Sequence, residues 1–172
     1  MADFTQEQIA AQCRISGPQL VGLPAGIDGA QLLWAISGNE SSFGANCAPR
    51  YEPAYDVGGR YGSGPVMKPL LEKFGSAAAC SYGPLQLMFC TAPGGALPSD
   101  FDDLDTAFKY SVIYLNHLLR RWKPGYLAQI GECWNEGHEE GSPQGEPVES
   151  SSPQVAAYVQ RLTANYQVPM PE

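Results

Sequence analysis

The sequence predicts a mainly α-helical protein with at most a minor sheet, folded as a single domain over residues 1–172. A chain of 172 residues can bury one core but falls short of the length at which chains usually divide. Several segments carry apolar residues at helical spacing, and few show the alternation typical of strands. The composition, 44% hydrophobic and 16% charged, is that of a folded protein.

Two helices are predicted in the N-terminal part of the chain. Thr5 and Gln8 have the capping-box spacing, so the first helix is expected to run from Thr5 to about Ile15. Asp28 is a suitable N-cap for the second. Apolar side chains spaced by three and four residues give this second helix one buried stripe, formed by Leu32, Leu33 and Ile36.

Residues 48–79 are expected to form an irregular insert, because they are rich in Tyr, Gly and Arg and have little periodicity. Within the insert, Pro65 to about Phe74 predicts a short helix that Gly75 ends. A compact apolar segment, Ser81 to Thr91, follows. The core of the domain is expected to extend from about residue 28 to residue 166.

The strongest helical pattern is Asp103 to Trp122, with acidic residues at its start and basic residues at its end, as the helix dipole favours. This segment is the predicted central helix. Further helices are expected from about Tyr126 to Trp134, and from Pro153, an apt first-turn residue, to about Tyr166. Residues 138–152 are rich in Gly, Pro, Ser and Glu and predict a surface loop.

The net charge of -8 argues against nucleic-acid binding, which needs clustered Lys and Arg. Attraction of an anionic polymer would have to be local to a cleft. No apolar run approaches the roughly 18 residues of a membrane span, so no transmembrane segment is expected.

The number of cysteines is odd, so at least one has no partner within the chain. None forms a CxxC pair and ligand-spaced histidines are missing, so neither a metal site nor a cofactor is predicted. One or two disulfides are expected if the protein works outside the cytosol, with Cys80 and Cys90 an attractive pair. Buried, unbridged thiols are the alternative. The cysteines are Cys13, Cys47, Cys80, Cys90 and Cys133.

Glu40 is the leading catalytic candidate. It follows Ile36 by four residues, which puts its carboxyl at the end of the second helix, near the side that faces the core. Burial there would raise its pKa. A carboxylic acid with a raised pKa can protonate the leaving oxygen of a glycosidic bond near neutral pH. The alternative is an ordinary solvated glutamate at a helix end.

Four segments of the chain resemble motifs of soluble lytic transglycosylases and goose-type lysozymes, in the same order. Glu40–Phe43 looks like their Glu-Ser-x-Phe motif, whose glutamate is the catalytic acid/base. Ser81–Met88 is similar to their Gly-Leu-Met-Gln segment, and Cys133–Gly137 to their Ala-Tyr-Asn-x-Gly segment. Tyr158–Val159 is similar to a Tyr-Val pair whose hydroxyl approaches the catalytic carboxylate.

The resemblance implies a lysozyme-like α fold that cleaves the β-1,4 bond between N-acetylmuramic acid and N-acetylglucosamine in peptidoglycan, with Glu40 as catalytic residue. Pro84 departs from the family motif and removes a backbone donor, and Trp134 keeps a stacking face but lacks the usual phenol. For Gln86, the alternative is a buried side chain that forms hydrogen bonds with backbone groups. For Tyr82, Trp134 and Tyr158, the alternative is packing in the core. The implied substrate-binding residues are Ser41, Tyr82, Gln86, Trp134, Asn135 and Tyr158.

The attacking nucleophile decides the product. Attack by the sugar's own 6-hydroxyl gives a 1,6-anhydro sugar, the transglycosylase outcome. Attack by water makes the protein a hydrolytic muramidase, which usually uses a second carboxylate. Glu52 and Asp56 are the candidates for that group, and the alternative is that they are structural carboxylates of the insert. A non-catalytic cell-wall-binding protein is the less expected third interpretation.

The expected partner is the glycan strand of peptidoglycan, on which the chain would act as a monomer in the periplasm or outside the cell. Residues Met1 to Gln12 lack the basic and apolar pattern of a signal peptide. We therefore expect a phage-encoded or virion-associated protein, or one exported by another route.

Overall fold

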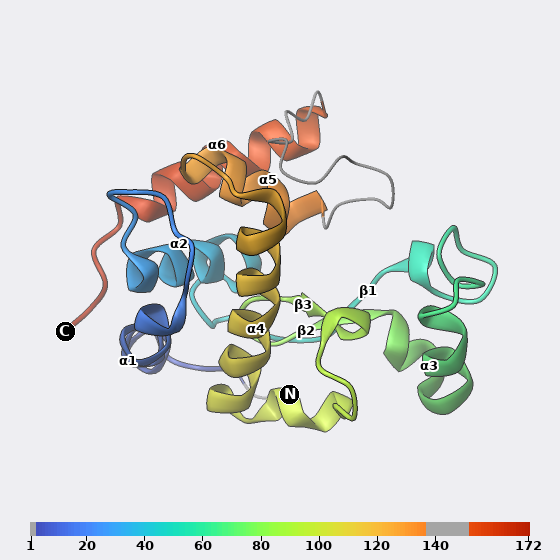
Figure 1. Ribbon diagram of the computed structural model, residues 1–172. Helices are drawn as coiled ribbons and strands as arrows, with labels where there is room; N and C mark the ends of the chain where they lie inside the picture. Colours follow the sequence, from blue (N-terminus) through green and yellow to red (C-terminus); the bar gives the residue numbers. More distant parts are fainter. Residues whose placement is uncertain (1–2, 137–151) are drawn as a thin grey trace.

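Polar caps begin the N-terminal helices of the computed structural model, which describes residues 3–136 and 152–172 (Figure 1). α1 (Gln6–Ser16) starts after Thr5, whose hydroxyl accepts a hydrogen bond from the Gln8 amide while the Gln8 side chain accepts one from the Thr5 amide. α2 (Gly29–Ser41) starts after Asp28, whose carboxylate accepts a hydrogen bond of 2.8 Å from the Gln31 amide. Both predicted helices are confirmed, together with their caps.

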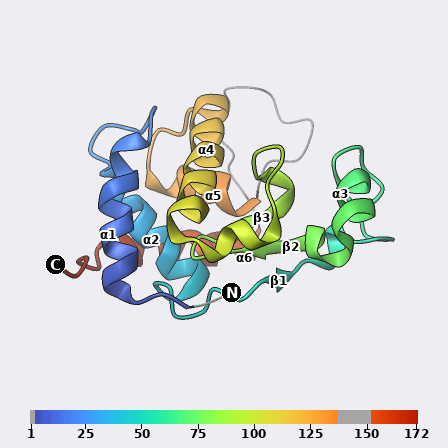
Figure 2. The ribbon, with the colours of Figure 1, turned by 90° about the horizontal axis from the view of Figure 1, so that it is seen from below.

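A small antiparallel sheet carries the middle of the chain. Its strands are β1 (Arg50–Tyr51), β2 (Cys80–Tyr82) and β3 (Leu87–Met88), in the order β1-β2-β3. Arg50 pairs with Ser81, and Ser81 pairs with Met88. The sheet lies between the helical body and α3 in both ribbon views (Figures 1 and 2). A mainly helical chain with a minor sheet is therefore confirmed.

The insert over residues 48–79 contains more regular structure than its composition predicts. After β1 come a 3-10 turn (Pro53–Tyr55), the helix α3 (Met67–Phe74) and a second 3-10 stretch (Gly75–Ala79). The predicted helix begins at Met67 instead of Pro65, because Met67 and not the exposed Val66 supplies its buried side. Gly75 ends the helix with a φ of 60°, which suits a glycine.

Three helices complete the fold: α4 (Leu104–Trp122), α5 (Leu127–Glu136) and α6 (Pro153–Tyr166). Asp103 caps α4 by accepting a hydrogen bond of 2.9 Å from the Thr106 amide. α6 packs against both α2 and α5. The predicted surface loop at 138–152 lies outside the described residues except for Ser152, the residue before α6.

One cluster of buried side chains runs through these helices and the sheet. Its largest fully buried members come from α2, α4 and the segment before α4, namely Trp34, Trp122, Phe108 and Phe101. Burial of such side chains is the main favourable term in folding. Among the described residues, no helix is long and apolar enough to cross a membrane.

All five cysteines are free thiols, so the expected Cys80–Cys90 disulfide is absent. Cys80 begins strand β2, whereas Cys90 lies in a 3-10 turn (Phe89–Thr91) that follows β3. The alternative of unbridged thiols holds, and burial raises the pKa of the Cys133 thiol to about 12.

Candidate functional site

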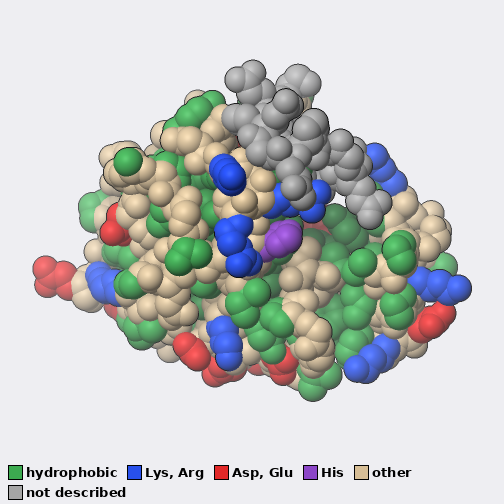
Figure 3. All heavy atoms as spheres, in the orientation of Figure 1, with side chains coloured by type: hydrophobic (Ala, Val, Ile, Leu, Met, Phe, Trp, Pro, Cys, Tyr) green, Lys and Arg blue, Asp and Glu red, His purple; other side chains and the backbone are tan. Residues whose placement is uncertain are grey.

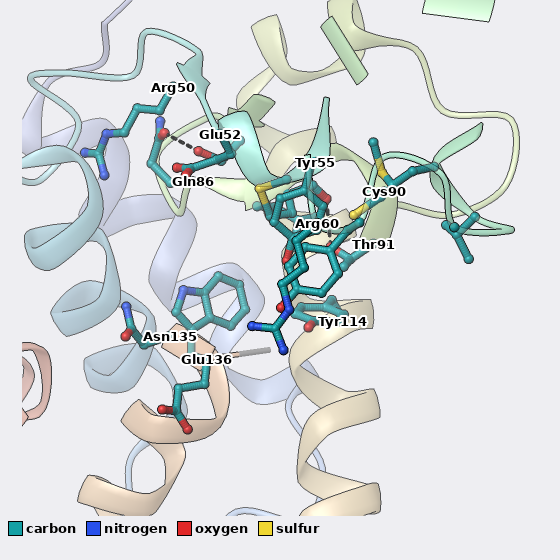
Figure 4. Close-up of a pocket in the computed structure, with 18 of the residues that line it drawn as sticks. Arg50, Glu52, Tyr55, Arg60, Gln86, Cys90, Thr91, Tyr114, Asn135 and Glu136 are labelled. Atoms are coloured by element: carbon teal, nitrogen blue, oxygen red, sulfur yellow. Dashed lines mark hydrogen bonds between the residues drawn. The ribbon is translucent and has the colours of Figure 1, made fainter. Parts of the chain in front are cut away.

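A cleft of about 1030 Å³ lies where the end of α2, the sheet, the insert, α4 and α5 meet (Figure 4). Hydrophobic side chains gather on the surface between the helical body and α3 (Figure 3). The lining includes four aromatic side chains and equal numbers of arginines and glutamates. These residues are Tyr55, Tyr61, Tyr114, Trp134, Arg50, Arg60, Arg121, Glu40, Glu52 and Glu136.

Glu40 reaches this cleft from the last turn of α2. Its Oε1 accepts a hydrogen bond of 2.9 Å from the Tyr158 hydroxyl and one of 3.2 Å from the Trp134 indole N–H. Its Oε2 lies 3.5 Å from an Nη atom of Arg50. The side chain is only 13% exposed. The predicted helix-end carboxylate is thus neither solvated nor isolated.

Burial raises the pKa of the Glu40 carboxyl above its ordinary value, and this effect outweighs the others. The hydrogen bond from Tyr158, the charge of Arg50, the hydrogen bond from Trp134 and the charge of Arg161 all lower the pKa in part. The net direction agrees with the sequence-based expectation. A carboxyl in this state can hold a proton at a higher pH than a solvated glutamate can.

Arg50 joins the sheet to the catalytic candidate. It projects from β1 and donates a hydrogen bond to the backbone carbonyl of Glu40, in addition to its contact with Oε2. The side chain is 43% exposed. A cation near the C-terminal end of a helix also complements the helix dipole. Arg50 was not predicted as a site residue from the sequence, because no local pattern links position 50 to position 40.

Tyr158 was predicted from the sequence as a site residue, and the structure places its hydroxyl in hydrogen-bond contact with Glu40. Asn39 donates a hydrogen bond of 3.0 Å to the Tyr158 carbonyl and accepts one of 2.8 Å from Asn165. These bonds tie α2 to α6 at the residue that precedes Glu40. Burial and the neighbouring Glu40 charge raise the pKa of Tyr158, so its hydroxyl stays protonated and remains a donor.

Trp134 on α5 has a role beyond the expected stacking face, since its indole N–H donates to Glu40. The ring is 8% exposed and meets Tyr114 edge-on, with centroids 5.9 Å apart. Trp134 therefore offers a hydrogen-bond donor at its polar edge as well as an aromatic face. Its exposed neighbour Asn135 also lines the cleft (Figure 4).

Gln86 lines the cleft, but its side chain is satisfied within the protein. Its amide nitrogen donates to the carbonyls of Gly83 at 2.9 Å and Ala48 at 3.3 Å, and its oxygen accepts from the Ser81 hydroxyl at 2.8 Å. The backbone of Gln86 has a φ of 46°, which belongs to the left-handed region. These contacts fit the alternative role, a buried glutamine that satisfies backbone groups and fixes the β2–β3 turn.

Two residues predicted to bind substrate do not line the cleft. Ser41 is 1% exposed, and its hydroxyl donates to the Ser37 carbonyl and accepts from the Gly44 amide. It closes the turn after α2, where the next two residues have positive φ. Tyr82 is 5% exposed, stacks on Phe101 with centroids 5.2 Å apart and donates to the Ala77 carbonyl. Both predictions are corrected to structural roles.

The structure separates the two candidates for a second carboxylate. Glu52 lines the cleft with Arg50, and the two residues share one face of the extended chain because side chains alternate along it. Asp56 does not line the cleft, and its carboxylate accepts hydrogen bonds from the Tyr51 hydroxyl and the Val57 amide. These bonds lower the pKa of Asp56. Asp56 is therefore corrected to a structural carboxylate of the insert.

Within residues 3–136 and 152–172, no group of three or more His, Cys, Asp or Glu side chains is placed to hold a metal ion. The cleft instead combines one buried carboxyl, two neutral donors and an aromatic lining. Such a lining provides stacking faces, and its charged groups provide hydrogen bonds to a polar ligand. In comparisons by sequence and by structure, no family model, no curated protein and no solved structure matched this chain.

Proposed function

We propose that this protein is a peptidoglycan glycosidase of the lytic transglycosylase type, built on a lysozyme-like α fold, with Glu40 as general acid and base. The observation that carries the proposal is the buried Glu40 carboxyl, held by Tyr158 and Trp134 in the wall of a cleft. A raised pKa is what a carboxylic acid needs to protonate a glycosidic oxygen near neutral pH.

The contacts of Glu40 assign different roles to its two oxygens. Oε1 already accepts hydrogen bonds from Tyr158 and Trp134, so the proton belongs on Oε2. In the first step, Oε2–H protonates the oxygen that links N-acetylmuramic acid to N-acetylglucosamine, and the C1–O bond breaks. Arg50, next to Oε2, stabilises the carboxylate that this transfer creates.

In the second step, the same carboxylate removes the proton from the 6-hydroxyl of the muramic acid residue. That oxygen then bonds to C1, which closes the 1,6-anhydro ring and restores the protonated Glu40. The step consumes no water and needs no second carboxylate. It therefore requires only the groups found around Glu40.

Hydrolysis is the second candidate outcome, because Glu52 lies in the same cleft as Glu40. In that reaction a water molecule held by a second carboxylate attacks C1, and the product carries a free reducing end. A protein that only bound the cell wall would have no use for a carboxyl kept in a desolvated site. The proposed partner is the glycan strand, reached at the cell wall by a monomer.

The decisive experiment incubates purified sacculi with the protein and measures the masses of the released muropeptides. Products lighter by one water indicate the transglycosylase, and unmodified reducing ends indicate the muramidase. We expect Glu40→Gln to lower the rate by about 10²–10⁴-fold while the fold is retained. Glu72→Gln on the exposed side of α3 is the matched control and should keep full activity. Undiminished lysis by Glu40→Gln would rule out the proposed mechanism.

A further inference from the structure

Asn39 precedes Glu40 in the last turn of α2 but does not line the cleft. Both ends of its side-chain amide are engaged with α6. The amide nitrogen donates a hydrogen bond of 3.0 Å to the Tyr158 carbonyl, and the oxygen accepts one of 2.8 Å from the Asn165 side chain. The bond from Asn165 fixes which end of the amide faces Tyr158, because only the nitrogen end can donate. Asn39 is therefore held in one orientation.

The bond between Asn39 and the Tyr158 carbonyl is not needed to complete the helix. A carbonyl inside an α-helix already accepts a hydrogen bond from the amide four residues later. Its oxygen has a second lone pair, and Asn39 donates to it. The backbone of α6 would be satisfied without Asn39, so the bond serves to restrain where Tyr158 lies relative to α2.

Gly38 makes room for this arrangement. A Cβ atom at position 38 would lie 2.8 Å from Nδ2 of Asn165 and 2.6 Å from the Phe43 ring. Glycine is a poor helix former, so its place within α2 is explained by the space that the Asn165 amide needs to reach Asn39. α2 and α6 thus approach each other closely just before Glu40.

We propose that Asn39 is a positioning residue, which holds the backbone of Tyr158 so that the Tyr158 hydroxyl reaches Oε1 of Glu40. That hydroxyl donates to Oε1 at 2.9 Å. Hydrogen bonds weaken as their distance and angle depart from the optimum, so a shift of α6 against α2 would weaken this one. The catalytic consequence rests on the proposed function, whereas the hydrogen-bond geometry does not depend on any substrate.

The pKa of Glu40 distinguishes a positioning role of Asn39 from a merely stabilising one. Burial raises this pKa, and four side chains of the described residues lower it. They are Tyr158 from α6, Arg50 from β1, Trp134 from α5 and Arg161 from α6. Asn39→Leu alters none of these side chains but loosens the bond from Tyr158, so it should raise the pKa of Glu40. NMR titration of the carboxyl in the whole protein measures this pKa without any substrate.

The same substitution is then made in the Tyr158→Phe variant. That variant has no hydroxyl to position, so Asn39→Leu should leave its Glu40 pKa unchanged. Equal rises in the two backgrounds would overturn the inference, because Asn39 would then act on Glu40 by another route. Asn165→Ala removes the bond that orients the Asn39 amide and should cause a smaller rise. It takes the place of Asn39→Leu in this comparison if Asn39→Leu does not fold.

Gln31→Leu is the matched control. Gln31 also joins α2 to the end of α6, through hydrogen bonds of 2.9 Å and 2.8 Å from its amide nitrogen to the carbonyls of Tyr166 and Val168. Its loss should lower the melting temperature and leave the pKa of Glu40 unchanged, since Gln31 lies near the start of α2. A rise in pKa as large as that of Asn39→Leu would overturn the inference, because any loosening of α2 and α6 would then have the same effect.

Activity on sacculi provides the second readout. Asn39→Leu should lower kcat by about three- to ten-fold, less than Tyr158→Phe does, and should move the descending limb of the pH–rate profile to higher pH. Gln31→Leu should show wild-type rates. If the wild-type protein cleaves no sacculi but the rise in pKa depends on Tyr158, the proposed function fails and the positioning role of Asn39 stands. If sacculi are cleaved and the pKa does not respond to Asn39→Leu, the positioning role fails and the proposed function stands.

Discussion

The Tyr158 hydroxyl on α6 donates a hydrogen bond of 2.9 Å to Oε1 of Glu40 on α2. Burial favours the neutral form of Glu40, whereas this hydrogen bond favours the charged form. The two effects oppose one another within a single contact. An acid that must first give up a proton and then regain it needs this balance, because either form held too firmly would stop the cycle.

Removing the hydroxyl with Tyr158→Phe should raise the pKa of Glu40 further, because the carboxylate loses a donor. A general acid works only below its pKa, so the descending limb of the pH–rate profile should move to higher pH. We expect kcat to fall by about 10–100-fold, since one charge-assisted hydrogen bond is lost. Steady-state rates on sacculi between pH 4 and pH 9 would measure both effects.

Tyr166→Phe is the matched control on the same helix, because the Tyr166 hydroxyl accepts its bond from the Asp28 amide, remote from Glu40. Its profile should overlay that of the wild type. If the Tyr158→Phe profile also overlays it, the contact does not set the pKa of Glu40.

Arg50→Gln should also raise the pKa of Glu40, because it removes a positive charge 3.5 Å from Oε2. The carboxylate formed after proton transfer loses its counter-charge, so kcat should fall by about ten-fold. Arg50→Lys should restore part of the rate, since it returns the charge without the bond geometry. Unlike the effect of Tyr158→Phe, the difference between wild type and Arg50→Gln should shrink at high salt, because Arg50 is partly exposed. A salt-independent difference would contradict an electrostatic role.

The helices were predictable because their signals are local. Thr5, Asp28 and Asp103 each cap a helix through side-chain bonds to residues three positions later, and sequence shows this spacing directly. Glu40 was predictable for a related reason: its distance from the buried Ile36 fixes its place on the helix. The insert was less predictable, since Met67 and Leu71 bury one side of a short helix between segments without periodicity.

The contacts between distant segments were not predictable from local patterns. Ser41 lies beside Glu40 in the motif, but the chain turns sharply after α2, and this turn draws the Ser41 hydroxyl into the protein. Arg50 meets Glu40 only because β1 pairs with β2 next to the end of α2. The same pairing sets which side chains of the insert face the cleft, and so distinguishes Glu52 from Asp56.

Glu52→Gln and Asp56→Asn together decide which product chemistry the cleft supports. If water is the nucleophile, Glu52→Gln should lower the rate by about 10²-fold or more, because the attacking water loses its base. If the 6-hydroxyl attacks, Glu52→Gln should change kcat by less than about three-fold, within the range of a lost contact. Asp56→Asn should leave the rate unchanged in either case, since Asp56 does not line the cleft. Masses of the released muropeptides provide the independent check.

Glu40 should also make the stability of the protein depend on pH. Its pKa is raised in the folded state, so the folded chain holds a proton that the unfolded chain has lost above about pH 4.3. Stability therefore falls as the pH rises through the window between the two pKa values. Glu40→Gln removes this titration, so its melting temperature should rise relative to the wild type as the pH rises from about 4 through the raised pKa of Glu40.

The opposite trend is expected for Asp103→Asn, measured in the same way. Hydrogen bonds from Thr106 lower the pKa of Asp103, so its contribution is present at neutral pH and is lost as the pH falls through the lowered value. The melting temperature of this variant should fall relative to the wild type as the pH rises.

For the Glu40 prediction, the contradicting result would be parallel curves of melting temperature against pH for the wild type and Glu40→Gln. Such curves would show that Glu40 titrates as a solvated carboxyl does.

Gly131 allows α5 and α6 to approach closely enough for Trp134 and Tyr158 to reach the same carboxylate oxygen. A Cβ atom at this position would lie 2.7 Å from Cδ2 of Leu162, a side chain that is fully buried. Gly131→Ala should therefore push the helices apart and destabilise the protein by about 1–3 kcal/mol, although alanine itself favours the helix by about 1 kcal/mol. Urea denaturation measures this change. Activity should fall with it, because the donors to Glu40 separate. Gly94→Ala is the control: its Cβ would meet nothing within 4 Å, so neither stability nor activity should change. If Gly131→Ala is as stable as the wild type, the packing of Leu162 does not set the distance between α5 and α6.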